Sequence, residues 1–421
     1  MASGVVVTVI NAVTMMVAFP IYLHFLGYET YGVWLVLATV LSFAQLGNLG
    51  IGQAVMKLVA EEHGRGDTEG IQRYVTTALA LLCLSGSLVL IAVLVFKTQI
   101  IAAFKLSNEN AETVSWLLPY IGILSIYVFI VQALNATLSG LGRMDLANYV
   151  QSFGRIAAVT VTAVLLYTGR GIESLLIGNT ISYVFIHLIS LICIWRIASI
   201  HLLRINNLDA QRGKRILPFG GAVFGGSVIS MFLSPFNKLM LSRYAGVSTI
   251  PVYEIAFRAS MQVRGLVEAG LKALMPEISR IGANMTRYAK DRISQINRRA
   301  MKLIFLFGVP MYCGIIILLT PLLKFWLRQG FVDELPVAFR IMLISTFLSL
   351  LSVPSYYTLL GLGMVRYTLM SHIILSCVSA LIVATNVFIC HSISVERISW
   401  AILTATAVTT LYLTRQKNEK F

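Results

Sequence analysis

The sequence has few charged residues for its length. Only 12% of its 421 residues are Asp, Glu, Lys or Arg, while 57% are hydrophobic; soluble domains carry about 25% charged residues. The hydrophobic residues form repeated runs, long enough to cross a hydrocarbon layer about 30 Å thick. This pattern excludes a soluble globular protein and indicates a polytopic membrane protein. Continuous runs, rather than weak alternation of apolar and polar residues, favour helices over a membrane β-barrel.

Motifs for nucleotide, metal and covalent chemistry are also lacking. The sequence contains no GxxxxGK[ST], GxSxG or HExxH motif, so we expect no ATP hydrolysis by this chain and no catalytic role. The connections predicted on the outer side are too short to hold a catalytic domain. The cysteines lie in apolar runs without CxxC spacing, which favours packing roles over disulfides or a metal site: they are Cys83, Cys193, Cys313, Cys377 and Cys390. No cofactor is expected.

Acidic residues are fewer than basic ones, 18 against 33, which gives a net charge of +15. The basic residues are scattered in short connections between apolar runs, so they indicate topology rather than nucleic-acid binding. Most of those in connections fall in one set of alternate connections, which the positive-inside rule places in the cytoplasm together with both termini. The other set holds Lys97, Lys105, Arg170, Arg243, Lys324, Arg328 and Arg397.

We predict about twelve membrane-spanning helices. The first apolar stretch has no basic region before it and runs on for a full span, so we expect a span there and no signal peptide. The longest connections are 199–215 and 281–299. The predicted spans are 2–26, 31–58, 74–96, 113–139, 147–168, 172–196, 216–243, 250–277, 301–323, 336–360, 367–390 and 396–414.

Two pairs of similar segments indicate an internal duplication. The stretch TLSGLG at 137–142 recurs as TLLGLG at 358–363, an offset of 221, and residues 27–56 match 246–275 at an offset of 219. We therefore predict two homologous six-helix lobes that insert the same way up and enclose a central cavity for alternating access. The predicted divisions are an N-terminal lobe 1–198, a cytoplasmic linker 199–215, a C-terminal lobe 216–414 and a cytoplasmic tail 415–421.

Ionisable residues occupy one face of the predicted span 250–277. At 100° per residue they share an arc of about 120°. Each would cost about 2.5–3.5 kcal/mol against lipid at the centre of the span, so we expect the stripe to face water in the cavity between the lobes. Pairing at i,i+4 within the helix is the alternative. The stripe consists of Glu254, Arg258, Arg264, Glu268 and Lys272.

Four further polar residues are weaker candidates for the cavity. Lys238 is expected near the outer interface, where its ammonium reaches either water or the cavity. Arg155 is expected within reach of the inner headgroups. Gln45 and Asn48 line the cavity or form interhelical hydrogen bonds; both interpretations stay open.

The sequence resembles the polysaccharide and O-antigen flippases of the multidrug/oligosaccharidyl-lipid/polysaccharide (MOP) exporter superfamily. The similar segments are FPIYL at 19–23, LGYETYGVW at 26–34, LGNLGIG at 46–52, GV at 246–247, VYEIA at 252–256 and PEIS at 276–279. Members often carry an acidic residue near Asn237 and Lys238, which is absent here.

The resemblance implies a polyprenyl-pyrophosphate-linked oligosaccharide as substrate, flipped from the inner to the outer leaflet of the bacterial inner membrane. It also implies coupling to an H⁺ or Na⁺ gradient, and a polysaccharide polymerase machinery as partner. Arg258, Arg264 and Lys272 are expected to bind the pyrophosphate, with Glu254 or Glu268 separating the cations in the empty site. A multidrug or cation antiporter of the same superfamily and a peptidoglycan-precursor flippase are the alternatives.

Overall fold

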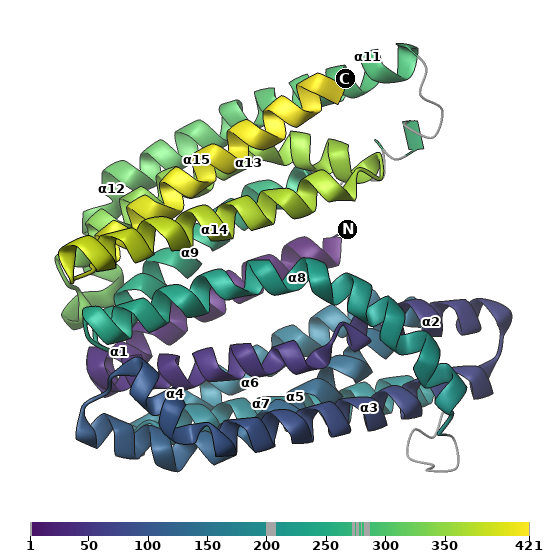
Figure 1. Cartoon of the computed structure of the whole chain (residues 1–421), viewed down its shortest axis with the longest axis horizontal. Helices are drawn as coiled ribbons and strands as arrows, with labels where there is room; N and C mark the ends of the chain where they lie inside the picture. Colours follow the sequence, from purple (N-terminus) through teal and green to yellow (C-terminus); the bar gives the residue numbers. More distant parts are fainter. Residues whose placement is uncertain are drawn as a thin grey trace. The chain divides into compact units, whose positions relative to one another are not determined.

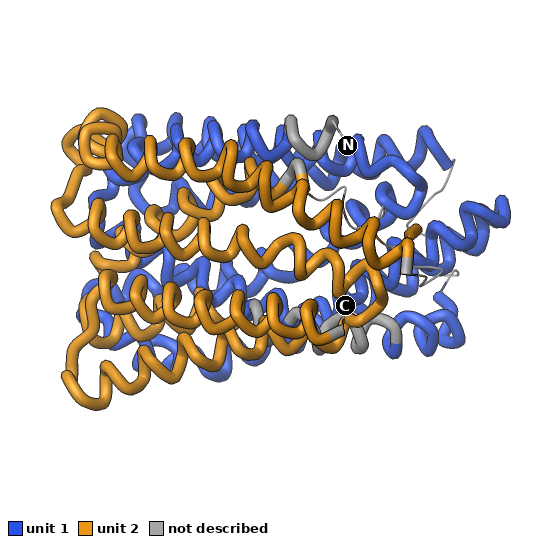
Figure 2. Tube along the Cα trace, turned by 90° about the horizontal axis from the view of Figure 1, so that it is seen from above, with its two compact units in different colours: residues 1–231 blue, residues 232–421 orange. Residues whose placement is uncertain are grey.

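A computed structural model of the chain describes residues 2–198, 208–271, 274, 278, 280–281 and 287–420. The regular elements within these residues are helices, which confirms the predicted all-α class. They form two compact units, Met1–Met231 and Phe232–Phe421, coloured separately in Figure 2. The boundary between the units falls within α8 (Ala210–Tyr244). The predicted homologous lobes, 1–198 and 216–414, are defined by the internal repeat and not by packing. They stay a prediction.

The first unit is arranged around one central helix, α5. This helix packs against α2, α3, α6 and α7, while α1 packs against both α5 and α6 (Figure 1). Its helices are α1 (Ala2–Ala44), α2 (Ile51–Arg65), α3 (Thr68–Val95), α4 (Lys97–Phe104), α5 (Asn108–Gly140), α6 (Met144–Tyr167) and α7 (Glu173–Ala198).

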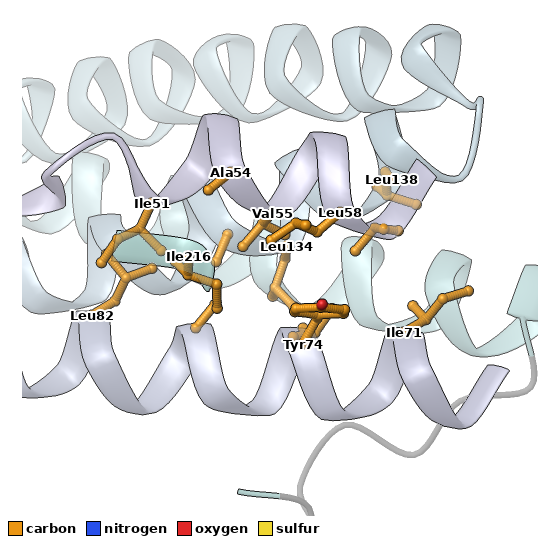
Figure 3. Packing of buried hydrophobic residues seen from close by; sticks show 14 of the residues in the cluster. Ile51, Ala54, Val55, Leu58, Ile71, Tyr74, Leu82, Leu134, Leu138 and Ile216 are labelled. Carbon is orange, nitrogen blue, oxygen red and sulfur yellow. The ribbon is translucent and has the colours of Figure 1, made fainter. Parts of the chain in front are cut away.

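An apolar core holds α2, α3 and α5 of this unit together. Tyr74 and Leu82 of α3 pack with Leu134 of α5 and with α2, and Ile216 at the start of α8 joins them (Figure 3). Asp209 caps α8 by accepting a hydrogen bond from the backbone N–H of Gln211 (2.9 Å). The Asp209 backbone N–H also donates to the Thr77 hydroxyl of α3 (3.1 Å), so packing and a hydrogen bond both fix the start of α8 against α3.

The polypeptide bends at Gly27 and again near Gly50. Gly27 has a φ of 70° inside α1, where we expected the first span to end. The predicted second span, 31–58, is not continuous: a 3₁₀ turn, Gln45–Asn48, follows α1, and Leu49 and Gly50 both adopt left-handed conformations before α2 begins. Glycine permits this conformation and weakens a helix interior, which explains the interruption.

The second unit is arranged around α13 in the way that the first is arranged around α5. This helix packs against α9, α11, α12, α14 and α15, and it ends in the second copy of the repeated TLxGLG stretch. The helices of the unit beyond α8 are α9 (Thr249–Leu271), α11 (Arg287–Leu303), α12 (Val309–Leu327), α13 (Glu334–Gly361), α14 (Val365–Cys390) and α15 (Val395–Lys420); a π turn, Ile304–Gly308, joins α11 to α12.

Three predicted non-helical segments contain helix. The short α4 lies in the predicted connection after residue 96, most of the connection 281–299 belongs to α11, and α15 continues through the predicted tail to Lys420. These three stretches are too polar or too short to appear as long apolar runs, so a search for such runs missed them.

Eight segments of the described residues are long and apolar enough to cross a membrane. Val7–Asn48 contains most of the first predicted span and most of the second, and Tyr288–Gly330 contains the ninth. The predicted spans without such a segment correspond to α8, α9 and α15. In α9 four charged side chains lower the hydropathy. The chain is thus a multi-pass α-helical membrane protein.

Candidate functional site

The charged stripe of α9 divides between two environments. Its first part, Glu254 and Arg258, forms a buried ion cluster with α8, and its second part, Arg264 and Glu268, lines a cavity. This corrects the expectation that the whole stripe faces one hydrated surface. Lys272 lies outside the described residues.

Glu254 is at the centre of the buried cluster. Glu254 is 1% exposed and Lys238 is 5% exposed. A carboxylate oxygen of Glu254 lies 2.8 Å from Nζ of Lys238. The Arg258 Nε–H donates to the same carboxylate, while most of the Arg258 side chain stays accessible. Two cations thus neutralise one carboxylate that has little access to solvent. The arrangement makes Glu254 and Lys238 partners of each other and leaves both outside the cavity.

A cavity of about 430 Å³ lies within the second unit, among α8, α9, α13, α14 and α15. Its charged residues are Arg264 and Glu268 of α9, and its rings come from Phe257, Tyr356, Tyr357 and His372. Hydroxyl side chains form much of the remaining wall: Ser260, Ser345, Thr346, Ser349, Ser352, Ser371, Thr406, Thr409 and Thr410.

Arg264 and Glu268 are held in defined positions at this wall. Arg264 Nη2 lies 3.3 Å from a Glu268 carboxylate oxygen, and the Tyr357 hydroxyl donates to the other oxygen at 3.0 Å. The Arg264 side chain is 27% exposed. Its Nε–H is buried and finds no acceptor among the described residues. An unsatisfied guanidinium donor at a cavity wall is suited to an anionic ligand.

The hydroxyl groups of the wall present oxygen acceptors to the cavity. Ser349 donates to the Thr346 carbonyl oxygen (2.7 Å) and Thr406 to that of Ile402 (2.7 Å). Because these protons are committed to the helix backbone, the hydroxyl oxygens keep free lone pairs. The cavity therefore combines one unsatisfied cationic donor with many neutral acceptors.

A second, smaller cavity of about 290 Å³ lies within the first unit, where α2 begins beside α5. Asn48 donates through Nδ2 to Gln132 Oε1 and accepts from the Gly52 backbone N–H at 3.2 Å. Asn135 Oδ1 is buried and has no hydrogen-bond partner among the described residues. The cavity is lined by Asn48, Gly50, Gly52, Gln53, Met56, Gln132, Asn135, Ala136 and Ser139.

The two cavities occupy equivalent places in the predicted repeat. At the offset of 221, four residues of α5 correspond to four residues of α13, and all eight line their respective cavities. Both sets precede the repeated TLxGLG stretch by a few residues or overlap it. The pairs are Gln132 and Val353, Asn135 and Tyr356, Ala136 and Tyr357, and Ser139 and Leu360.

The remaining predicted residues are dispersed. Gln45 is half-buried in the 3₁₀ turn before α2 and does not line the small cavity, whereas Asn48 does. Arg155 is exposed on α6. Reasoning from the sequence did not place Tyr357, His372, Gln132 or Asn135 at a cavity, although all four line one. The repeat was the signal that could have identified these residues of α5 and α13. Polar or aromatic residues at equivalent positions beside a repeated motif are expected to line equivalent cavities.

Comparison with known proteins gives concordant matches in sequence. A model of the family described as polysaccharide biosynthesis protein matches residues 1–282. The chain is 19% identical, over 357 residues, to a Shigella flexneri protein that carries the name of an O-antigen transporter. That match covers 82% of this chain and 80% of the Shigella protein.

The fold is similar to two solved transporters. The lipid II flippase MurJ, in an inward closed conformation, gives a TM-score of 0.80 at 15% identity, covering 98% of this chain and 87% of MurJ. The inward-facing conformation of a multidrug resistance MATE family transporter of the MOP superfamily gives 0.76 at 15% identity, covering 98% of this chain and 94% of that one. These are folds of transporters and flippases, not of enzymes.

Proposed function

We propose, because the chain belongs to the polysaccharide biosynthesis protein family, that it is a flippase for a lipid-linked oligosaccharide. Its substrate is a polyprenyl-pyrophosphate carrying an oligosaccharide repeat unit, moved from the cytoplasmic to the outer leaflet of the bacterial inner membrane. The name of the Shigella relative and the fold of the lipid II flippase support a lipid-linked glycan as cargo.

The observation that carries the proposal is the unsatisfied guanidinium of Arg264 in the cavity of the second unit. A pyrophosphate presents several anionic oxygens, and arginine binds such groups with paired, charge-assisted donors. The Nε–H makes no hydrogen bond within the described residues. The neighbouring hydroxyl oxygens of α13 and α15 cannot compete with phosphate for this donor, because they carry no charge.

Glu268 is the counter-ion of Arg264 in this cavity. It pairs with Arg264 while Tyr357 fixes its second oxygen. In our proposal the pyrophosphate replaces Glu268 on Arg264, and Glu268 pairs with Arg264 again once the cargo has left. An H⁺ or Na⁺ gradient drives the cycle in this proposal. Tyr356 and Tyr357 on α13 and His372 on α14 line the same cavity as this pair.

A multidrug or cation antiporter is less well supported by this cavity. An antiporter for organic cations needs an acidic residue that is available to its cargo. Within the described residues that line the cavity, Glu268 is the acidic residue, and it is already paired with Arg264. A peptidoglycan-precursor flippase would use the same anion chemistry and differs in cargo.

The proposal is tested with Arg264→Gln in a strain that lacks the chromosomal gene. Losing a charge-assisted hydrogen bond costs about 1.5–3 kcal/mol, which corresponds to a roughly tenfold to hundredfold loss of transport. We expect surface glycan to fall accordingly and lipid-linked repeat units to accumulate in the cytoplasmic leaflet, at unchanged protein level.

Arg340→Gln is the matched control. Arg340 also lies in a helix of the second unit, but its guanidinium donates to Thr320 (2.8 Å) and does not line the cavity. Its replacement should leave export close to wild type. Normal export by Arg264→Gln would refute the assignment of the pyrophosphate to this cavity.

A further inference from the structure

The small cavity of the first unit differs in chemistry from its counterpart in the second. We propose that it binds a neutral sugar ring of the transported oligosaccharide, through hydrogen bonds to Asn135, to Gln132 and to the backbone at the start of α2. This inference rests on the proposed function, since it assigns the sugar part of the same substrate.

The wall of this cavity selects against charged ligands. Of the described residues that line it, none is ionisable, and four carry side-chain amides: Asn48, Gln53, Gln132 and Asn135. Removing a phosphate or an ammonium group from water is costly unless an opposite charge compensates. An amide-lined cavity therefore favours a ligand that is polar but uncharged.

An unpartnered acceptor belongs to one of the side chains that line this cavity. Asn135 Oδ1 is buried without a hydrogen-bond donor, although buried polar atoms in proteins are nearly always paired. The atom belongs to α5, the central helix of the unit, at a position that lines the cavity. A hydroxyl group of a ligand would supply the missing proton. A sugar hydroxyl group can therefore donate the hydrogen bond that Asn135 Oδ1 lacks.

The other amides are already oriented. Asn48 is held at both ends, by Gln132 through its Nδ2 and by the Gly52 backbone N–H through its Oδ1. Gln132 accepts this hydrogen bond through its carbonyl oxygen. The contact therefore does not occupy the two donors of its –NH₂ group. Fixed amides with donors and acceptors are suited to the alternating donor and acceptor character of neighbouring sugar hydroxyls.

The interruption before α2 brings backbone to the cavity wall. Gly50 adopts a left-handed conformation and caps α2 without any side-chain hydrogen bond. Gly50 and Gly52 both line the cavity, so a ligand can approach the main chain where a side chain would otherwise stand. The volume of about 290 Å³ is at the lower limit for ligand pockets. It therefore suits one sugar ring.

The predicted duplication explains why the two cavities have different ligands. Equivalent positions on the central helices carry Gln132 and Asn135 in the first unit but Val353 and Tyr356 in the second. Arg264 corresponds, at the offset of 219, to the uncharged Gln45 in the 3₁₀ turn before α2. The second unit therefore carries a cation whose Nε–H lacks an acceptor, Arg264, and the first unit carries an amide whose oxygen lacks a donor, Asn135.

The test uses the full-length protein, purified in detergent, and its thermal unfolding midpoint. The probes are free glucose, galactose, rhamnose and N-acetylglucosamine, each at high concentration, and separately inorganic pyrophosphate. We expect at least one of the sugars to raise the midpoint of the wild type. Asn135→Leu removes the unmet acceptor and should abolish that rise without lowering the midpoint of the unliganded protein.

Gly52→Leu provides a second variant that fills the cavity. A Cβ atom at position 52 meets nothing closer than 3.8 Å, at the Asn48 amide, so the substitution fits locally, and leucine favours the helix more than glycine does. It should also abolish the response to sugar. Gly52→Ala adds only the tolerated methyl group and should keep it. Asn179→Leu is the control for loss of a helix amide elsewhere, since Asn179 donates to the Leu175 carbonyl oxygen outside the cavity.

The outcomes separate this inference from the proposed function. Pyrophosphate should stabilise wild type, Asn135→Leu and Gly52→Leu alike, and fail with Arg264→Gln. If no sugar raises the midpoint, or if the rise persists in both Asn135→Leu and Gly52→Leu, the sugar site is overturned. If the sugar response behaves as expected but pyrophosphate does not bind, the anion site of the second unit fails and the sugar site stands.

Discussion

At the residue scale, the Lys238–Glu254 pair illustrates how a membrane protein retains buried charge. The two side chains come from α8 and α9, and both are almost fully enclosed. Charges removed from water need partners at short distance, and losing one partner leaves the other uncompensated. The pair is therefore expected to matter for stability more than for cargo.

Replacing one partner should be worse than replacing both. Glu254→Gln leaves Lys238 without its counter-ion and is expected to cost about 3–5 kcal/mol. Lys238→Met combined with Glu254→Gln should recover most of that loss. The measurement is a double-mutant cycle on the unfolding free energy of the purified protein. Additive losses would show that the two side chains do not depend on each other.

Sequence reasoning found some of these contacts and not others. The i,i+4 spacing predicts the Glu254–Arg258 and Arg264–Glu268 pairs, and both form. The spacing cannot predict that Lys238 joins Glu254, because that contact depends on how two helices pack. For the same reason the sequence showed no sign that Tyr357 binds Glu268.

At the element scale, the interruption between Ala44 and Ile51 is the feature that positions the small cavity. The hydropathy of the segment predicted one continuous helix here, because the segment is apolar. Hydropathy averaged over a full span does not show a local interruption of the helix. The glycines in LGNLGIG were the available signal. The structure shows that the main chain turns left-handed at Leu49 and Gly50.

Two glycine substitutions in this segment should have opposite effects. Gly50 has a φ of 71°, and a Cβ in that region costs roughly 1–2 kcal/mol, so Gly50→Ala should lower the thermal unfolding midpoint. Gly52→Ala, two residues further into α2, should leave it unchanged or raise it. Equal midpoints for the two variants would contradict a left-handed Gly50.

At the scale of the whole molecule, composition alone predicted an all-α polytopic membrane protein, and this is confirmed. It could not predict the division into compact units at Met231 and Phe232, because that depends on which helices pack together. The central roles of α5 and α13 agree with the repeat, which ends both helices in the same stretch. The arrangement of two homologous lobes around a central cavity stays a prediction.

The orientation of the chain in the membrane can be tested with alkaline phosphatase, which is active only outside the cytoplasm. We expect activity when it is fused after Gly169, between α6 and α7, and none when it is fused after Gly142 or at the C-terminus. The reason is the uneven distribution of Lys and Arg between alternate connections. The reverse pattern of activity would invert the predicted topology.

The correspondence between α5 and α13 also bears on how such proteins diversify. When a gene segment is duplicated, each copy can accumulate changes without disturbing the other. If recognition of sugar depends on the residues at 132, 135, 136 and 139, a lineage can adopt a new glycan by altering one short stretch of α5. The handling of the phosphates, which all such cargoes share, then remains intact in the descendant of the other copy.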